Sequence, residues 1–268
     1  MQFDYGTQLS PSPIVLSIGT LIKPKLKDIS DTSKGMSFDK FNYFEFLIKM
    51  TPESFYTKLK GDDGKKYWNT LSEDERDELT LYDIIISDNQ LIDTFVEVFN
   101  FFFLERVVFQ DGFFVLLKES NQSEIGVISE ENVRGVISDK TFMQVLNAIQ
   151  QICGIADKEE EVDESKFKNK LAKKLFYKMQ KAKKKEREDR KGDINFSLPN
   201  IISAVSNKHP TISPINIWDL TVFQLLDSFN RTQVNTMFDI DSTRVSVWGD
   251  EKKTFNAALW YKNDYDNK

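Results

Sequence analysis

The chain has 268 residues, a formal net charge of -6 at pH 7 and 22 Phe within an apolar content of 40%, which excludes global disorder because so much aromatic surface favours burial. One cysteine, Cys153, and one histidine, His209, exclude an internal disulfide and disfavour a zinc site or a Ser-His-Asp triad. No signal-peptide pattern occurs and no span reaches the roughly 18 apolar residues of a membrane helix, so we expect a cytosolic protein without metal, cofactor or membrane contact.

The first part of the chain predicts a short hairpin followed by helices. Apolar residues around a glycine predict the hairpin over residues 14–22. Ser37 is placed to cap a helix over 38–50, and Thr51-Pro52 starts the next helix with Pro at its first position. The run Gly61-Asp62-Asp63-Gly64 lacks the spacing of a phosphate-binding loop and is expected to be a polar surface loop.

Two further helices are predicted before the next strands. Ser72, with Glu75 three residues later, forms a capping-box pattern that predicts a helix over 73–86. A longer helix after Asp88 is expected to be the core helix of the N-terminal part, because its apolar side chains share one broad face: Leu91, Ile92, Phe95, Phe99, Phe102 and Phe103.

The clearest hairpin covers residues 107–117, where Asp111-Gly112 supplies residues that tolerate a tight turn. A third short strand is expected at 126–128, and Ser129, followed by two glutamates, is expected to restart a helix. The N-terminal part therefore combines helices with a small sheet.

The last helix of this part should begin at Ser138 or Asp139 and end near Ile152, with Gly154 beyond its end. Cys153 lies at this helix end, and the local sequence offers no cation that would lower its pKa. We therefore expect Cys153 to be an inert, buried or half-buried thiol.

The charge pattern reverses near the middle of the chain. An acidic run over 157–164 is followed by residues 166–191, where thirteen Lys and Arg stand against three acids. Apolar residues recur every four positions in the first half of this basic stretch and predict an amphipathic helix. The lysines beyond it form a basic arm that suits a solvated connector, a protein-binding arm or, least well given the acidic chain and the scarcity of Arg, a nucleic-acid contact: Lys181, Lys183, Lys184 and Lys185.

The C-terminal part is predicted to be helical over 198–205 and 218–237, and the second helix has an apolar face too broad for a fully exposed helix. The fold class expected for the whole chain is mainly α. A helical bundle with short β-hairpins occupies residues 1–156, a charged helical connector occupies 157–192, and a smaller helical part occupies 193–268.

The string Asp239-Ile240-Asp241-Ser242-Thr243 matches the DxDxT pattern of phosphatases of the haloacid dehalogenase type. That pattern needs a hydrophobic strand before it and a large α/β domain after it, and neither is indicated here. We expect an acidic turn that ends or caps a helix, and no enzyme activity.

Two regions carry a family resemblance. Residues 18–29 with 43–47, and residues 217–231 with their Trp, Thr and Gln-Leu-x-Asp core, resemble tail assembly chaperones of tailed phages that infect Gram-positive bacteria, as does the tail from Trp248 to Tyr261. The resemblance implies a protein that coats the tape measure protein while the tail tube polymerises around it. It also implies some members made in a short form and a C-terminally extended form.

This resemblance implies the tape measure protein as partner, with the tail tube protein and self-association as further options, and the cytoplasm of the infected host as location. Alternatives left open are a virion structural protein of the tail or baseplate and a nucleic-acid-associated phage protein. Most of the Phe side chains are expected to bury only the chain's own core. The side chains that could form a partner groove are Phe95, Phe99, Phe102, Phe103, Trp218, Phe223, Leu226 and Phe229.

Overall fold

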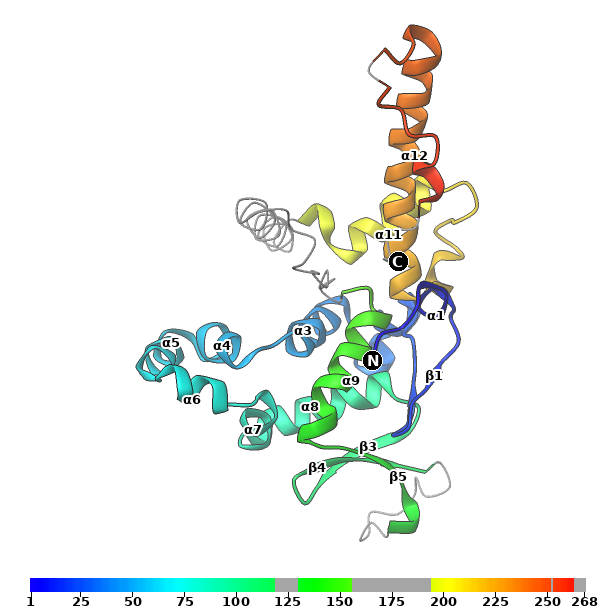
Figure 1. The fold of residues 1–268 in the computed structure, drawn as a ribbon. Helices are drawn as coiled ribbons and strands as arrows, with labels where there is room; N and C mark the ends of the chain where they lie inside the picture. The colour runs from blue at the N-terminus through cyan, green and yellow to red at the C-terminus, as the bar shows by residue number, and fades with distance from the viewer. Residues whose placement is uncertain (119–129, 156–193, 252, 263–268) are drawn as a thin grey trace. The chain divides into compact units, whose positions relative to one another are not determined.

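The computed structural model describes residues 1–118, 130–155, 194–251 and 253–262, and this part of the chain is mainly α with a two-stranded and a three-stranded sheet (Figure 1). The expected fold class is thereby confirmed. The strand expected at 126–128 and the connector at 157–192, with Lys181, Lys183, Lys184 and Lys185, lie outside the described residues. No helix among the described residues is long and apolar enough to cross a membrane.

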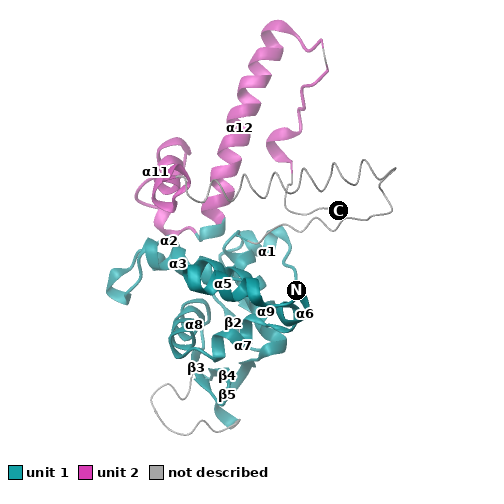
Figure 2. Cartoon of the chain, turned by 90° about the vertical axis from the view of Figure 1, so that its left-hand side faces the viewer, with its two compact units in different colours: residues 1–155, 221–223, 265–268 teal, residues 156–220, 224–264 magenta. Residues whose placement is uncertain are grey.

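The chain divides into two compact units, coloured separately in Figure 2. Unit 1 contains Met1–Ile155 and Thr221–Phe223, and unit 2 contains Ala156–Leu220 and Gln224–Asp264. The helices of unit 1 are α1 Tyr5–Leu9, α2 Leu26–Ile29, α3 Phe38–Ile48, α4 Pro52–Ser54, α5 Gly61–Thr70, α6 Glu73–Glu78, α7 Leu81–Ile86, α8 Asn89–Phe102 and α9 Asp139–Ile152. Its strands are β1 Ile14–Val15, β2 Thr20–Leu21, β3 Arg106–Gln110, β4 Phe113–Leu117 and β5 Val133–Ile137.

The three-stranded sheet of unit 1 is antiparallel in the order β3-β4-β5. Asp111 and Gly112 both have positive φ in the β3-β4 turn, which confirms the hairpin expected from this dipeptide. The helix expected after Ser129 is wrong, because only a short 3-10 turn over Glu130–Asn132 precedes β5. Val133 and Val136 favour a strand, and pairing with β4 outweighs the helix-start pattern.

The core of unit 1 is built from aromatic side chains of α8, α9 and β4. Phe99 of α8 lies 5.0 Å from Phe114 of β4 between ring centroids, and Phe95 lies 5.6 Å from Phe142 of α9. These four rings are fully buried, so α8 and α9 cover one face of the sheet through tilted and edge-to-face contacts. Cys153, one residue past α9, is also buried, and burial raises the pKa of its thiol as expected for an inert cysteine.

Helix starts in unit 1 follow the side-chain caps expected from the sequence. The Ser37 hydroxyl accepts the Lys40 N–H at 3.1 Å, and Ser72 forms a capping box with Glu75. The single helix expected over 73–86 is wrong, because Thr80 begins a second helix, α7, by accepting the Asp83 N–H at 3.1 Å. One side chain with capping geometry therefore divides the predicted helix in two.

The surface loop expected at Gly61-Asp62-Asp63-Gly64 is also wrong, since these residues form the first turn of α5. A π-helix over Phe55–Leu59 precedes α5 and packs against it. A methyl group at Gly64 would lie 2.3 Å from the carbonyl oxygen of Tyr56. The glycine therefore serves close helix packing, which also places Tyr56 and Trp68 in a stacked pair 5.8 Å apart.

Unit 1 is completed by three residues from far along the chain. Thr221 forms an antiparallel bridge with Lys25, and the Val222 N–H donates to the Pro24 carbonyl at 3.2 Å. Phe223 is 1% exposed and lies 6.2 Å from the ring of Tyr5. The segment Thr221–Phe223 therefore belongs to the fold of unit 1 in spite of its place in the sequence.

Candidate protein-binding surface

Unit 2 is organised around α11, Leu198–Lys208, and the long helix α12, Val222–Trp248, whose first two residues belong to unit 1. The sequence predicted an end for this second helix near Met237. The helix in fact continues three turns further. These additional turns carry both the DxDxT string and a row of exposed apolar side chains.

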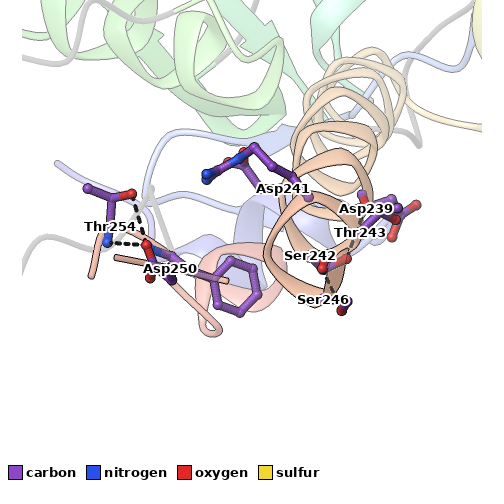
Figure 3. A network of polar contacts seen from close by, with 9 residues as sticks. Asp239, Asp241, Ser242, Thr243, Ser246, Asp250 and Thr254 are labelled. Atoms are coloured by element: carbon purple, nitrogen blue, oxygen red, sulfur yellow. Dashed lines mark hydrogen bonds and ion pairs between the residues drawn. The ribbon is translucent and has the colours of Figure 1, made fainter. Parts of the chain in front are cut away.

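The DxDxT string lies inside α12, so the expected helix-ending or capping turn is a wrong prediction (Figure 3). The hydroxyls of Ser242 and Thr243 donate to the Asp239 carbonyl at 3.0 and 2.8 Å, as hydroxyls inside a helix commonly do. Asp241 pairs with Arg244 at 3.3 Å. Because residues two apart on a helix do not face each other, Asp239 and Asp241 do not form a pair of convergent carboxylates.

Chemistry at other positions is equally limited in the described part of the chain. No group of three His, Cys, Asp or Glu side chains that could hold a metal ion occurs there. The ring Nδ1 of His209 accepts the N–H groups of Thr211 and Ile212 at 3.3 and 3.2 Å, so this histidine organises the turn after α11.

A groove of about 410 Å³ runs between α11 and α12 within unit 2. Phe229 of α12 contributes to it and lies 6.5 Å from the ring of Phe196. Neither helix places a carboxylate in the lining, which consists of Ala204, Val205, Lys208, Phe229, Thr232, Gln233, Thr236 and Met237. The groove is therefore largely apolar, with Lys208 as its cationic side chain.

One face of α12, from Arg231 onward, is covered by the chain that follows it. Phe255 packs on Phe238 with ring centroids 5.7 Å apart, and the Arg231 guanidinium donates to the Lys262 carbonyl at 2.7 Å. The Asp250 carboxylate accepts the N–H groups of Thr254 and Phe255 at 3.0 and 2.8 Å, which turns the chain back and lowers the pKa of Asp250. This covered face buries part of the apolar surface of α12.

The opposite face of α12 is open. Met237, Ile240 and Val247 are 61%, 63% and 65% exposed, and Trp248 at the end of the helix is 75% exposed. Together with Arg244 they follow spacings of three and four residues, so they lie on one side of the helix. We call this row, Met237, Ile240, Arg244, Val247 and Trp248, the α12 stripe. Met237 belongs both to the stripe and to the groove, which makes the two surfaces continuous.

The partner-binding residues expected from the sequence are only in part accessible. A partner cannot reach side chains that are at most 2% exposed in unit 1, so the expected binding role is a wrong prediction for Phe95, Phe99, Phe102, Phe103 and Phe223. These five fill the protein's own core, as expected for most of the Phe.

Three expected partner-binding side chains are half-buried: Trp218, Leu226 and Phe229. The Trp218 indole donates to the Pro214 carbonyl at 3.0 Å, and Phe229 lines the groove. The sequence analysis missed the α12 stripe because it placed the end of this helix near Met237. The spacing of three and four residues between the apolar side chains beyond Met237 was the signal that could have revealed the stripe.

Comparison with known protein families gives a match for the part of the chain that carries this surface. No curated protein and no solved structure matches the chain. Residues 182–264 match the family model described as YomV second domain, and this range ends at the last residue of unit 2. The C-terminal part of the chain is thus similar to a phage-associated family, which indicates a phage protein.

Proposed function

We propose that the protein is a non-enzymatic tail assembly chaperone of a tailed phage, which binds the tape measure protein in the host cytoplasm during tail morphogenesis. The observation that supports this proposal most directly is the α12 stripe, which is continuous with the α11/α12 groove inside the region similar to a phage-associated family. Apolar side chains aligned on one side of a helix are typical of surfaces that receive another helix.

The proposed mechanism is physical. A long helical protein with an apolar face aggregates before assembly unless that face is covered. The α12 stripe and the groove offer such a cover through several moderate contacts and no deep single site. Numerous weak contacts allow tube subunits to displace the chaperone as the tube grows, because each contact can be exchanged separately.

Co-expression with the phage's tape measure protein tests the proposal. The wild-type chain should keep that protein in the soluble fraction, and the double substitution Met237→Asp with Ile240→Asp should return it to the pellet. Both side chains are more than 60% exposed, so circular dichroism should show an unchanged fold. Tyr43→Asp, at an exposed aromatic of unit 1, is the matched control and should retain solubilisation.

Equal insolubility of the tape measure protein with and without the wild-type chain would contradict the proposal. A virion structural protein of the tail or baseplate would instead use the same apolar surface for permanent subunit contacts. Mass spectrometry of purified virions separates the two functions, because a chaperone should be absent from the particles and a structural protein should be present in stoichiometric amounts.

A further inference from the structure

We propose that the segment after α12 is an autoinhibitory strap, which covers an apolar row of this helix, opens reversibly, and must open before that row can receive the tape measure protein. The strap is residues 253–262, and the row consists of Val234, Phe238 and Val245, which we call the strap row. This inference rests on the proposed function, because it concerns the regulation of binding at α12.

The strap runs back along α12 in the opposite direction (Figure 1). Near its start, the ring of Phe255 lies 5.7 Å from the ring of Phe238. At its end, the carbonyl of Lys262 accepts the Arg231 guanidinium at 2.7 Å. Because the later strap residue contacts the earlier helix residue, the strap is antiparallel to the helix and lies over the side that carries Arg231 and Phe238.

The strap row has the spacing that one helix presents to another. Val234 precedes Phe238 by four residues and Val245 follows it by seven, so the three side chains lie on one side of α12. All three are half-buried, whereas Met237 and Ile240, on another side of the same turns, are more than 60% exposed. A row suited to a partner helix is therefore covered by a segment that is not an α-helix.

The strap itself buries little of its own surface. Within residues 253–262 no side chain is fully buried, and the half-buried ones are Phe255, Ala258 and Leu259. The large side chain of Trp260 is 52% exposed and adds little to the cover. Lys253 has a φ of 50°, a left-handed conformation that costs energy in a residue other than glycine. A segment with few buried apolar side chains and a strained start opens at a low cost in free energy.

Release of the strap enlarges the apolar surface that α12 offers. In the closed state the α12 stripe and the groove are accessible, and opening adds the strap row on another side of the same helix. A ligand that needs the open state binds more weakly in proportion to the fraction of molecules that are closed. The strap therefore limits exposure of apolar surface in the free protein and lowers its apparent affinity for the partner.

Labelling of a cysteine under the strap measures opening in the full chain. Val234→Cys places a thiol in the strap row, and the native Cys153 is fully buried and stays silent towards a maleimide. Phe255→Asp removes the ring that packs on Phe238 and should raise the labelling rate by about tenfold, because the rate follows the open fraction. Ala257→Asp adds the same charge at an exposed position of the strap and should leave the rate unchanged.

Competition for the tape measure protein measures the effect on binding. Wild-type and Phe255→Asp chains with different affinity tags are co-expressed with a limiting amount of that protein. The Phe255→Asp chain should be recovered in the complex in excess over wild type, by the same factor as the rise in labelling, because both measurements report the open fraction. The Ala257→Asp chain should compete equally with wild type.

The outcomes separate this inference from the proposed function. An unchanged labelling rate in the Phe255→Asp chain would overturn the inference, even where the tape measure protein is bound. Equal or weaker competition by that chain would also overturn it, because the strap would then not oppose binding. Dimers that form in sedimentation with Phe255→Asp alone would identify a second copy as the occupant of the row and overturn the inference too. Faster labelling with the tape measure protein bound by neither chain would support a reversible cover and contradict the proposed function.

Discussion

At the scale of single residues, Gly135 shows how closely the backbone of unit 1 is packed. A methyl group at this position of β5 would lie 2.1 Å from the carbonyl oxygen of Ile18 and 2.5 Å from its Cα. Real side chains do not approach a backbone this closely, so the hairpin loop that contains Ile18 sits against the sheet only because β5 has a glycine here. The contact joins the two sheets of unit 1.

Substitution of Gly135 by Ala should therefore destabilise unit 1. The β1-β2 loop would have to move away from β5, and we expect a loss of about 1 to 3 kcal/mol in the free energy of unfolding, measured by urea denaturation. Met143→Ala, at an exposed position of α9, is the control and should change stability by less than about 0.5 kcal/mol. Equal stability of the Gly135→Ala protein would show that the loop does not depend on this contact.

At the scale of elements, the start of α8 couples a helix cap to an ion pair. The Asp88 carboxylate accepts the N–H of Gln90 at 3.0 Å and is paired with Lys60 at 3.1 Å. The hydrogen bond from Lys60, followed by those from the helix N-terminus, lowers the pKa of Asp88 below its usual value of 3.8. The charged form of this side chain is therefore favoured in the folded protein.

This coupling predicts a pH dependence for Asp88→Asn. A carboxyl whose pKa is lower in the folded state adds stability above pH 3.8, and this contribution disappears as pH falls through the lower folded pKa. Because Asn still caps the helix, wild type should exceed Asp88→Asn by at most about 1 kcal/mol at pH 7, with a smaller difference below pH 3.8. Urea denaturation at several pH values measures this, and a difference that stays constant with pH would contradict the prediction.

Most elements with a local cause were predictable from the sequence, with the cap at Thr80 as an exception, and those with a distant cause were not. The cap at Ser37 and the Asp111-Gly112 hairpin depend on neighbouring residues, and both are present. The strand β5 and the first turn of α5 depend on packing against other parts of unit 1, and both were assigned wrongly. The apolar face of α8 also follows from local periodicity, and its expected place in the core of the N-terminal part is confirmed.

The candidate surface, too, was predictable from the sequence only where its cause is local. That the C-terminal helix has a broad apolar face was evident from its sequence, but Phe223 is taken into the core of unit 1 while Phe229 lines the groove of unit 2. These two residues lie on one helix and only six positions apart. The parts of the chain that pack against each turn of the helix decide which side stays exposed to solvent. Periodicity alone does not show which parts these are.

At the scale of the whole molecule, unit 1 is discontinuous in sequence because it includes Thr221–Phe223. Phe223→Ala should therefore destabilise unit 1, although the substitution lies in the C-terminal part of the sequence. A buried Phe replaced by Ala typically costs about 3 to 5 kcal/mol. Hydrogen exchange at the amides of Leu21 and Phe102, which lie in the core of unit 1, should become faster by the factor that corresponds to this loss of free energy of unfolding.

Leu226→Ala is the matched control, since Leu226 is half-buried, lies one turn later on α12 and belongs to unit 2. It should leave exchange at Leu21 and Phe102 unchanged. Unchanged exchange at these amides in the Phe223→Ala protein would mean that unit 1 is stable without the distant segment.

The discontinuity of unit 1 also affects the order of events during synthesis on the ribosome. Residues 1–155 leave the exit tunnel well before Thr221–Phe223, and at about 5 to 20 residues per second the intervening chain takes several seconds to produce. During this interval the Pro24 carbonyl lacks the Val222 N–H that donates to it in the finished protein, and Tyr5 lacks the Phe223 ring. The N-terminal part of the nascent chain therefore has an incomplete core during this interval. A chain terminated before residue 221 would lack the Phe223 ring that completes this core.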